Sequence, residues 1–197
     1  MTSGTTKSSI RPWIQLSDRL LQKTFAFDLR AKMMRSPDGS YEGDFFYLEC
    51  PNWANVVGLT EKDEVILVEQ FRHGIAESTL EAPGGIVDPH EVDPQAAAIR
   101  EMEEETGYTV GSVEPLGVFN PNPAILTNSC YLYLARNCRR IKAPQLDAAE
   151  DIAVHLIPLK EIPALIAAGK IKHCIALNAL LLLLFKVGNL TFPEKNS

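Results

Sequence analysis

The sequence lacks the features that mark secreted, disulfide-stabilised or membrane-spanning proteins. Its four cysteines form no C-x-x-C pair and no zinc-finger spacing, so we expect reduced thiols rather than a disulfide or zinc framework. The opening residues, MTSGTTKSSIRPW, contain no apolar stretch of the kind that a secretory signal needs. The longest apolar run, residues 175–185, is shorter than the roughly 20 residues of a membrane span. These absences predict a cytoplasmic protein without membrane partners.

An excess of basic residues is missing too. The chain has 19 Lys and Arg against 25 Asp and Glu, a net charge of −6, whereas nucleic-acid-binding surfaces are usually basic. We therefore expect no nucleic-acid partner. A hydrophobic content of 46% and a charged content of 22% are typical of a folded chain. The length of 197 residues predicts one domain with room for a small appendage.

Hydrophobic patterns and turn residues predict a mixed α/β domain with antiparallel-looking strands and few helices. A Pro-Asp-Gly turn within residues 36–40 predicts a hairpin between the strands 25–35 and 41–50. Asp93, Pro94 and Gly107 fit the start and the end of one helix. The remaining predicted strands are 56–59, 65–71, 113–119, 130–135 and 152–157, and the predicted helices are 94–106, 159–168 and 173–187.

The end of the helix 94–106 carries an unusual concentration of acidic residues. At about 100° per residue, Glu101, Glu104 and Glu105 share one helix face, and Glu103 lies on the opposite side. Carboxylate oxygens are the ligands that Mg²⁺ prefers. A solvated acidic face is the alternative interpretation, but like charges at i,i+4 repel and a helix C-terminus disfavours negative charge. A divalent cation over this face would offset both penalties.

Two neighbouring features fit a site of this kind. Gly84 and Gly85 permit close approach of the backbone, so that a main-chain group can reach a metal or a phosphate. Arg100 and Glu104 are at i,i+4 and can pair, which would fix the position of the carboxylates.

Together these residues resemble the Nudix box. The segment 84–108, GGIVDPHEVDPQAAAIREMEEETGY, matches its pattern at Gly85, Glu91, Arg100, Glu101, Met102, Glu104, Glu105, Gly107 and Tyr108. It departs from the pattern once, because eight residues rather than seven separate Glu91 from Arg100. The extra residue precedes the helix, where an insertion costs little. The motifs VEQFR, LEAPGG, NPNPAI, EDIAVHLIPL and GKIKHCIALNAL resemble the ADP-ribose and nucleotide-sugar pyrophosphatase branch, and together they cover most of residues 45–185.

The resemblance implies an α/β (α+β) fold, the Nudix α/β/α sandwich with a mixed sheet, plus an N-terminal antiparallel β-hairpin region. Residues 1–50 would form the polar tail and the hairpin region, with a role in dimerisation, and residues 51–190 would form the Nudix hydrolase domain. It further implies a homodimer. The implied reaction is Mg²⁺-dependent hydrolysis of the diphosphate bond in ADP-ribose or a nucleotide sugar, which yields a nucleoside monophosphate and a sugar phosphate. Mn²⁺ is expected to substitute for Mg²⁺.

The resemblance also implies roles for individual residues. The metal ligands would be the Gly84 carbonyl, Glu101, Glu104 and Glu105, and the substrate-binding residues would be Arg72, Glu81 and Gly85. The catalytic residues would be Arg100, Glu104 and Glu150. Glu150 is the leading candidate for the general base, ahead of Asp147 and Asp151, because Ala148 stands where relatives often carry another acid. Among the four histidines, His73 is the one expected near the substrate.

Three alternatives stay open. The acids around Glu150 would, in the simplest case, only cap a strand. The domain would otherwise be a non-catalytic ligand sensor or regulator, although the complete carboxylate set favours an enzyme. An enzyme of this family could also act on coenzyme A or a dinucleoside polyphosphate, since the sequence specifies neither the base nor the sugar.

Overall fold

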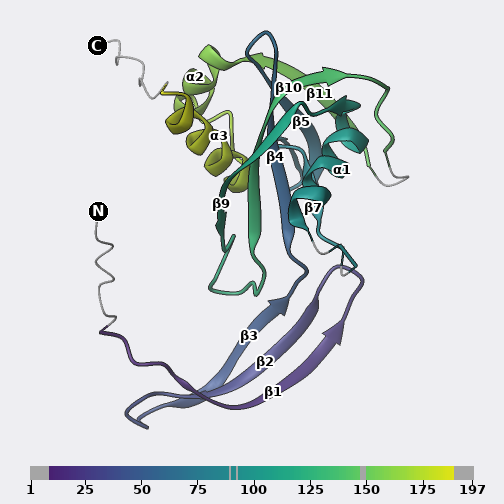
Figure 1. The fold of residues 1–197 in the computed structure, drawn as a ribbon. Helices are drawn as coiled ribbons and strands as arrows, with labels where there is room; N and C mark the ends of the chain where they lie inside the picture. Colours follow the sequence, from purple (N-terminus) through teal and green to yellow (C-terminus); the bar gives the residue numbers. More distant parts are fainter. Residues whose placement is uncertain (1–8, 89, 92, 147–149, 189–197) are drawn as a thin grey trace. The chain divides into compact units, whose positions relative to one another are not determined.

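The computed structural model describes residues 9–88, 90–91, 93–146 and 150–188, and these fall into two compact units (Figure 1). The first unit combines Met1–Cys50 with Asn122–Thr127, and the second combines Pro51–Pro121 with Asn128–Ser197. The segment Asn122–Thr127 therefore belongs to the N-terminal unit although strands of the second unit precede and follow it in sequence.

The second unit is built on a mixed sheet. In the described residues the central strand order is β11-β5-β4-β10-β8, with β6 paired to β5, β7 to β4 and β9 to β10. β4 and β10 are parallel, and the other pairs in this sheet are antiparallel. This confirms the predicted mixed sheet. The strand patterns looked antiparallel, and the parallel pair of β4 and β10 is the exception. The strands are β4 Trp53–Thr60, β5 Glu64–Arg72, β6 Glu77–Glu81, β7 Gly84–Ile86, β8 Tyr108–Thr109, β9 Ser112–Phe119, β10 Cys130–Arg140 and β11 Ile152–Pro158.

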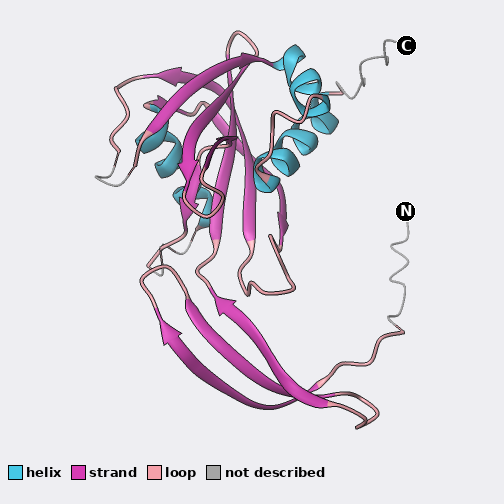
Figure 2. Cartoon of the chain, turned by 180° about the vertical axis from the view of Figure 1, so that it is seen from behind, coloured by secondary structure: helices cyan, strands magenta, loops and turns pink. Residues whose placement is uncertain are grey.

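Helices cover both faces of this sheet (Figure 2). α1 (Pro94–Thr106) lies on one face, and α3 (Cys174–Val187) lies on the other, preceded by the short 3₁₀ helix Leu159–Glu161 and α2 (Ile162–Ala167). Because successive strand residues point to opposite faces, β4 and β10 contribute to both cores. The α1 core contains Val56, Ile66, Ala97, Ala98, Met102 and Tyr133, and the α3 core contains Val57, Leu67, Leu132, Leu134, Leu180 and Leu183.

The boundaries of α1 follow directly from its terminal residues and confirm the predicted helix. The Asp93 carboxylate accepts a hydrogen bond from the backbone N–H of Gln95 at 2.9 Å, and Pro94 occupies the first turn. Gly107 ends the helix in the left-handed conformation, at φ 74°, and donates its N–H to the Glu103 carbonyl. The acidic segment therefore occupies the last two turns of α1.

Four strands, β1, β6, β7 and β8, were not predicted from the sequence. β1 (Ile14–Lys23) contains an Ser-Asp-Arg interruption, and bulges near Gln15 and Leu20 break its alternation. β6 and β7 are short. They form strands because they pair with β5 and β4, and not because their residues have a strong β propensity. The predicted helix 159–168 is divided into a 3₁₀ turn and α2.

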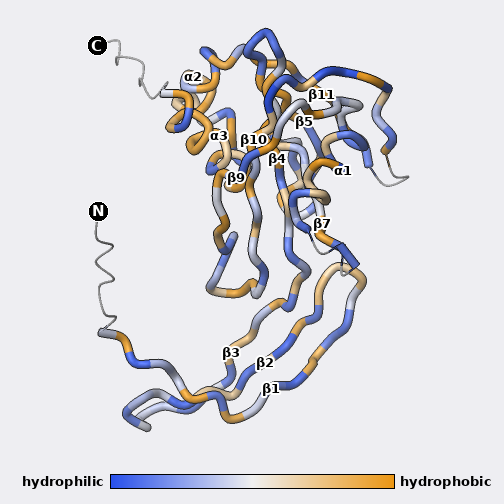
Figure 3. Tube along the Cα trace, viewed as in Figure 1, coloured by the Kyte–Doolittle hydropathy of each residue, from blue (hydrophilic) through white to orange (hydrophobic). Residues whose placement is uncertain are grey.

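The first unit is a three-stranded antiparallel sheet in the order β1-β2-β3, where β2 is Asp28–Arg35 and β3 is Glu42–Glu49. Hydrophobic and hydrophilic residues are interspersed along these strands (Figure 3). The segment 122–127 attaches to β3 through two hydrogen bonds, from the Leu48 N–H to the Ile125 carbonyl at 2.7 Å and from the Thr127 N–H to the Leu48 carbonyl at 3.2 Å. Among the residues of these three strands, all of them described, Ala31 is the one that is fully buried.

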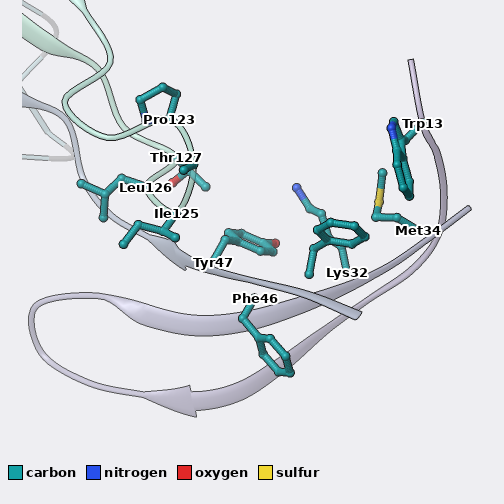
Figure 4. Close-up of a pocket in the computed structure, with 11 residues that line it drawn as sticks. Trp13, Lys32, Met34, Phe46, Tyr47, Pro123, Ile125, Leu126 and Thr127 are labelled. Carbon is teal, nitrogen blue, oxygen red and sulfur yellow. The ribbon is translucent and has the colours of Figure 1, made fainter. Parts of the chain in front are cut away.

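A groove of about 350 Å³ lies within this unit, between the sheet and the segment 123–127 (Figure 4). Four of the eleven residues that line it are aromatic. Trp13 packs edge-to-face against Phe45 with 5.3 Å between ring centroids, and the Lys32 ammonium lies 4.3 Å from the centre of the Tyr47 ring. The described helices of the chain include none with the length and apolar character to cross a membrane.

The α3 core predicts a stability difference between two residues of one helix. Leu180→Ala should reduce the free energy of unfolding by about 2–5 kcal/mol, because it leaves a cavity in a fully buried position. Phe185→Ala should change it by less than about 1 kcal/mol, because this side chain is 69% exposed. Urea denaturation measures both values, and equal losses would contradict the assigned packing of α3.

Candidate active site

The second half of α1 positions three carboxylates in different environments. Glu101 and Glu105 point inward, with Glu101 only 14% exposed at its side chain and Glu105 buried, whereas Glu104 remains 43% exposed. Because one turn of helix separates Glu101 from Glu105, both face the loop that contains Gly84 and Gly85. Burial therefore restricts the carboxylates of Glu101 and Glu105 more than that of Glu104, and the three together are called the carboxylate array.

Arg100 ties the array together. Its Nη1 donates to Glu101 Oε1 and to Glu104 Oε2, each at 2.9 Å, so the predicted Arg100–Glu104 pair is present. Its Nε donates to Glu91 Oε1 at 3.1 Å, which gives the acid of the preceding loop a structural partner. Hydrogen bonding to Glu91, with added attraction from Glu101 and Glu104, raises the pKa of Arg100 above its usual range. The guanidinium thus keeps a permanent positive charge between these carboxylates.

Glu105 lies beneath the glycine loop. Its Oε2 accepts a hydrogen bond from the Gly84 N–H at 2.9 Å. Burial raises the pKa of Glu105 to about 8, an effect that the Gly84 N–H opposes and the nearby charges of Glu101 and Glu150 strengthen. Gly85 is equally constrained, since a Cβ there would lie 2.4 Å from Glu101 Oε1 and would displace that carboxylate. The two glycines allow the backbone to contact both inward acids directly.

Glu150 reaches the same place from another element. A cavity of about 180 Å³ is lined by Arg100, Glu101, Glu104, Gln145 and Glu150. Burial raises the pKa of Glu101, and the negative charge of Glu150 adds to this rise, as it does at Glu105. Glu150 is therefore within electrostatic reach of both inward acids of α1. Asp151 is exposed, and Asp147 and Ala148 lie outside the described residues.

The loop that leads from β10 toward Glu150 is attached to the end of α1. The Gln145 N–H donates to the Glu104 carbonyl at 2.7 Å, and the Ile141 N–H donates to the Gly107 carbonyl at 2.9 Å. These bonds satisfy two carbonyls that the end of a helix leaves without partners. They also place the first part of the loop against the acidic turns of α1.

Arg72 and Glu81, which were predicted as separate substrate-binding residues, form a bidentate ion pair. Arg72 donates from Nε and Nη2 to the two oxygens of Glu81, at 2.7 and 2.6 Å. Glu81 also accepts a hydrogen bond from the Thr79 hydroxyl, and the His173 Nδ1 lies 3.3 Å from its Oε2. Although burial acts in the opposite direction, the hydrogen bonds from Arg72 and Thr79 hold the pKa of Glu81 below its usual value.

Arg72 links this pair to the carboxylates of α1. Hydrogen bonding to Glu81, together with attraction from Glu105 and Glu150, raises the pKa of Arg72. Its guanidinium therefore lies within electrostatic reach of Glu105 and Glu150, while its side chain stays 44% exposed. The fold brings together two arginines and five glutamates from α1, the strands and the loop. They are Arg72, Arg100, Glu81, Glu101, Glu104, Glu105 and Glu150.

The donor set fits a hard divalent cation. Three carboxylates and the backbone of Gly84 lie together, and such oxygens are typical ligands of Mg²⁺. Among the described residues, however, no group of three or more acidic, His or Cys side chains is arranged around a single point. The reason is visible in the contacts: Arg100 bridges Glu101 and Glu104, and Glu105 is bonded to a backbone N–H. A cation at this site would replace part of the charge that Arg100 supplies.

Sequence patterns missed Thr79, Gln145 and His173. Thr79 and Glu81 are two apart on β6 and share a strand face, so a prediction of this short strand would have revealed Thr79. Gln145 and His173 come near the site only through the tertiary fold, and no local spacing marks them. His73, expected near the substrate, lies in an exposed turn and packs edge-to-face against Phe71, with 5.3 Å between ring centroids.

Comparisons with known proteins agree with this geometry. A methanol dehydrogenase activator of Bacillus methanolicus is 36% identical over 110 residues, which cover 55% of this chain and 58% of that protein. An ADP-ribose pyrophosphatase of Bacillus subtilis is 27% identical over 122 residues, which cover 61% of this chain and 65% of that protein. The chain thus matches less than two thirds of the length of either relative.

A solved structure described as an ADP compounds hydrolase aligns with a TM-score of 0.79 and 18% identity, over 93% of this chain and 100% of the other. At this identity, the likeness shows a shared fold. The NUDIX domain model matches residues 52–176, which contain the sheet, α1 and the acidic cavity. The chain therefore belongs to the NUDIX domain family.

Proposed function

We propose that this protein hydrolyses the diphosphate bond of a nucleoside diphosphate linked to a sugar, with Mg²⁺ as the metal and Mn²⁺ as a substitute. The supporting observation is the cavity in which Glu150 faces the acidic end of α1. Family membership supports a Nudix hydrolase, and the name of the Bacillus subtilis relative favours ADP-ribose among the substrates. The products would be a nucleoside monophosphate and a sugar phosphate.

The proposed metal site consists of Glu101, Glu104, Glu105 and the Gly84 carbonyl. Bound Mg²⁺ would neutralise phosphate charge and lower the pKa of a coordinated water. The protein's own contribution is to hold the carboxylates in place, through Arg100 on one side and the Gly84 N–H on the other. Desolvation of Glu101 and Glu105 favours their association with a cation, since a buried negative charge needs a partner.

The remaining residues would orient the reaction. A Glu150 carboxylate oxygen would take a proton from the attacking water, while a new P–O bond forms and the P–O bond of the diphosphate bridge breaks. Arg72, which pairs with Glu81 in this structure, would bind the negatively charged diphosphate through its exposed guanidinium. Gly85 would let the phosphate approach the backbone beside Glu101.

We further propose that the protein acts as a homodimer in the cytoplasm. The three-stranded sheet of the first unit exposes several large apolar side chains, whereas small sheets need a covered hydrophobic face to be stable. A second copy would cover them. The exposed residues are Ile14, Leu16, Leu20, Leu21, Phe25, Phe45 and Phe46.

Regulation without catalysis is a second candidate function. The Bacillus methanolicus relative, named as an activator of methanol dehydrogenase, favours it, while the complete carboxylate array favours the hydrolase. Product analysis with ADP-ribose, ADP-glucose, UDP-glucose and GDP-mannose, with and without Mg²⁺, separates the two. We expect AMP and ribose 5-phosphate from ADP-ribose only when metal is present. Metal binding without turnover of these substrates, or of coenzyme A and dinucleoside polyphosphates, would favour the regulator.

The two faces of α1 provide a matched test of the metal site. Glu105→Gln or Glu104→Gln should lower kcat by about 10²-fold or more, because metal-assisted stabilisation of the transition-state charge is lost. Glu103→Gln on the opposite face should retain turnover, since Glu103 contacts only the exposed Lys142 at 3.9 Å among the ion pairs of the described residues. Steady-state kinetics with ADP-ribose measures this, and full activity of the Glu105→Gln variant would refute the metal assignment.

The proposed general base is tested separately from the metal site. Glu150→Gln should reduce kcat by about 10²-fold, because an amide cannot accept the proton of the water at neutral pH, while calorimetry should show an almost unchanged Mg²⁺ affinity. The adjacent, exposed Asp151→Asn variant is the control and should keep near-normal turnover. If Glu150→Gln also turns over normally, the base must be another residue.

The dimer proposal predicts a mass of twice 21.8 kDa in light scattering at micromolar concentration. Phe46→Asp should shift the protein to the monomer, because Phe46 is a 57% exposed apolar residue on β3 and a charge there opposes burial. Phe185→Asp, a 69% exposed position on α3, should leave the mass unchanged. A monomeric wild-type protein would remove the proposed interface.

A further inference from the structure

Glu81 is a buried carboxylate that accepts hydrogen bonds from two residues and has a histidine beside it. Its side chain is 2% exposed, so water cannot replace a lost partner there. Arg72 engages both of its oxygens, and Thr79 donates to Oε1. His173, the residue that precedes α3, places Nδ1 3.3 Å from Oε2, the oxygen that Arg72 Nη2 already occupies.

The His173 Nδ1 is itself an unusual atom. It is buried, and among the described residues it has no hydrogen-bond partner despite its position beside Glu81. A carboxylate can only accept hydrogen bonds, so the favourable tautomer carries its proton on Nδ1, toward Oε2. Burial lowers the pKa of His173, although Glu81 opposes this, which favours the neutral ring. The structure thus holds a buried ring nitrogen that lies 3.3 Å from Glu81 Oε2 without a hydrogen bond to it.

We propose that His173 is a positioning residue that takes over the Glu81 carboxylate when Arg72 turns toward the substrate diphosphate. The inference rests on the proposed function for the identity of the ligand that draws Arg72 away. Arg72 is 44% exposed and lies within electrostatic reach of Glu150, which lines the acidic cavity, so its guanidinium is accessible to a diphosphate bound there. Its departure would leave a buried carboxylate short of donors, which is costly. A hydrogen bond from the His173 Nδ1–H to Glu81 reduces that cost. The substrate then binds more tightly, because less of the binding free energy of Arg72 is lost.

A double-mutant cycle tests the exchange without any substrate. Arg72→Met removes the arginine permanently, and His173→Leu removes the reserve donor without loss of a helix cap, because His173 makes no side-chain capping bond. If His173 takes over Glu81, the Tm loss of the double variant should exceed the sum of the single losses by about 4 °C or more. In the Arg72→Met background, His173→Asn should leave the Tm unchanged, because the amide N–H of asparagine lies near the position of Nδ1. Additive losses would overturn the proposal.

Kinetics tests the same exchange in the working enzyme. His173→Leu and His173→Gln should raise KM for ADP-ribose about tenfold with kcat nearly unchanged, which corresponds to one lost hydrogen bond to a charged group. His173→Asn should restore KM, and Lys172→Met, one residue earlier and 59% exposed, should leave it unchanged. Equal KM values for the Leu and Asn variants would overturn the proposal.

The two experiments also separate this inference from the proposed function. A wild-type protein that hydrolyses no diphosphate but shows the non-additive Tm loss would refute the hydrolase and keep the exchange of donors at Glu81. An active wild-type enzyme with additive Tm losses would keep the hydrolase and refute the role of His173.

Discussion

Repulsion between buried carboxylates is the constraint on which this site depends. Glu101 and Glu105 are withdrawn from water one helical turn apart, at the end of a helix whose dipole already disfavours negative charge. Burial raises the pKa of both side chains, and the additional charge of Glu150 raises it further. Nothing in the stability of a helix requires such a cluster, so its persistence points to a partner of opposite charge. The proposed metal follows from this observation.

The sheet makes this constraint possible. α1 is held against β4 and β10 by a core that includes Met102 and Tyr133, and β7 is paired to the neighbouring part of β4. The glycine loop and the acidic helix face are therefore positioned by the same strand. The loop after β10 is attached to the end of α1 by backbone hydrogen bonds from Ile141 and Gln145. Three segments that are distant in sequence meet at the acidic end of α1 because they share β4, β10 and α1 as their support.

The sequence predicted those parts of the site that are encoded locally. The bounds of α1 followed from Asp93 and Gly107, and the common face of its acids followed from helical periodicity alone. Patterns of this kind also indicated most of the core strands. They did not reveal β6 and β7, since these short strands exist through pairing with their neighbours. The Arg72–Glu81 pair and the position of His173 depend on that pairing and on α3, so no spacing along the chain could indicate them.

The two arginines address one electrostatic problem in two ways. Arg100 is fixed by three glutamates and supplies a permanent charge where a metal would also act, so it neutralises the array before any ligand arrives. Arg72 has a single carboxylate partner and an exposed guanidinium, which leaves it free to change partners. A fixed charge suits the support of metal ligands, whereas a movable charge suits the capture of a diphosphate. The movable one needs a replacement donor behind it, and among the described residues His173 is the buried group that is placed to provide one.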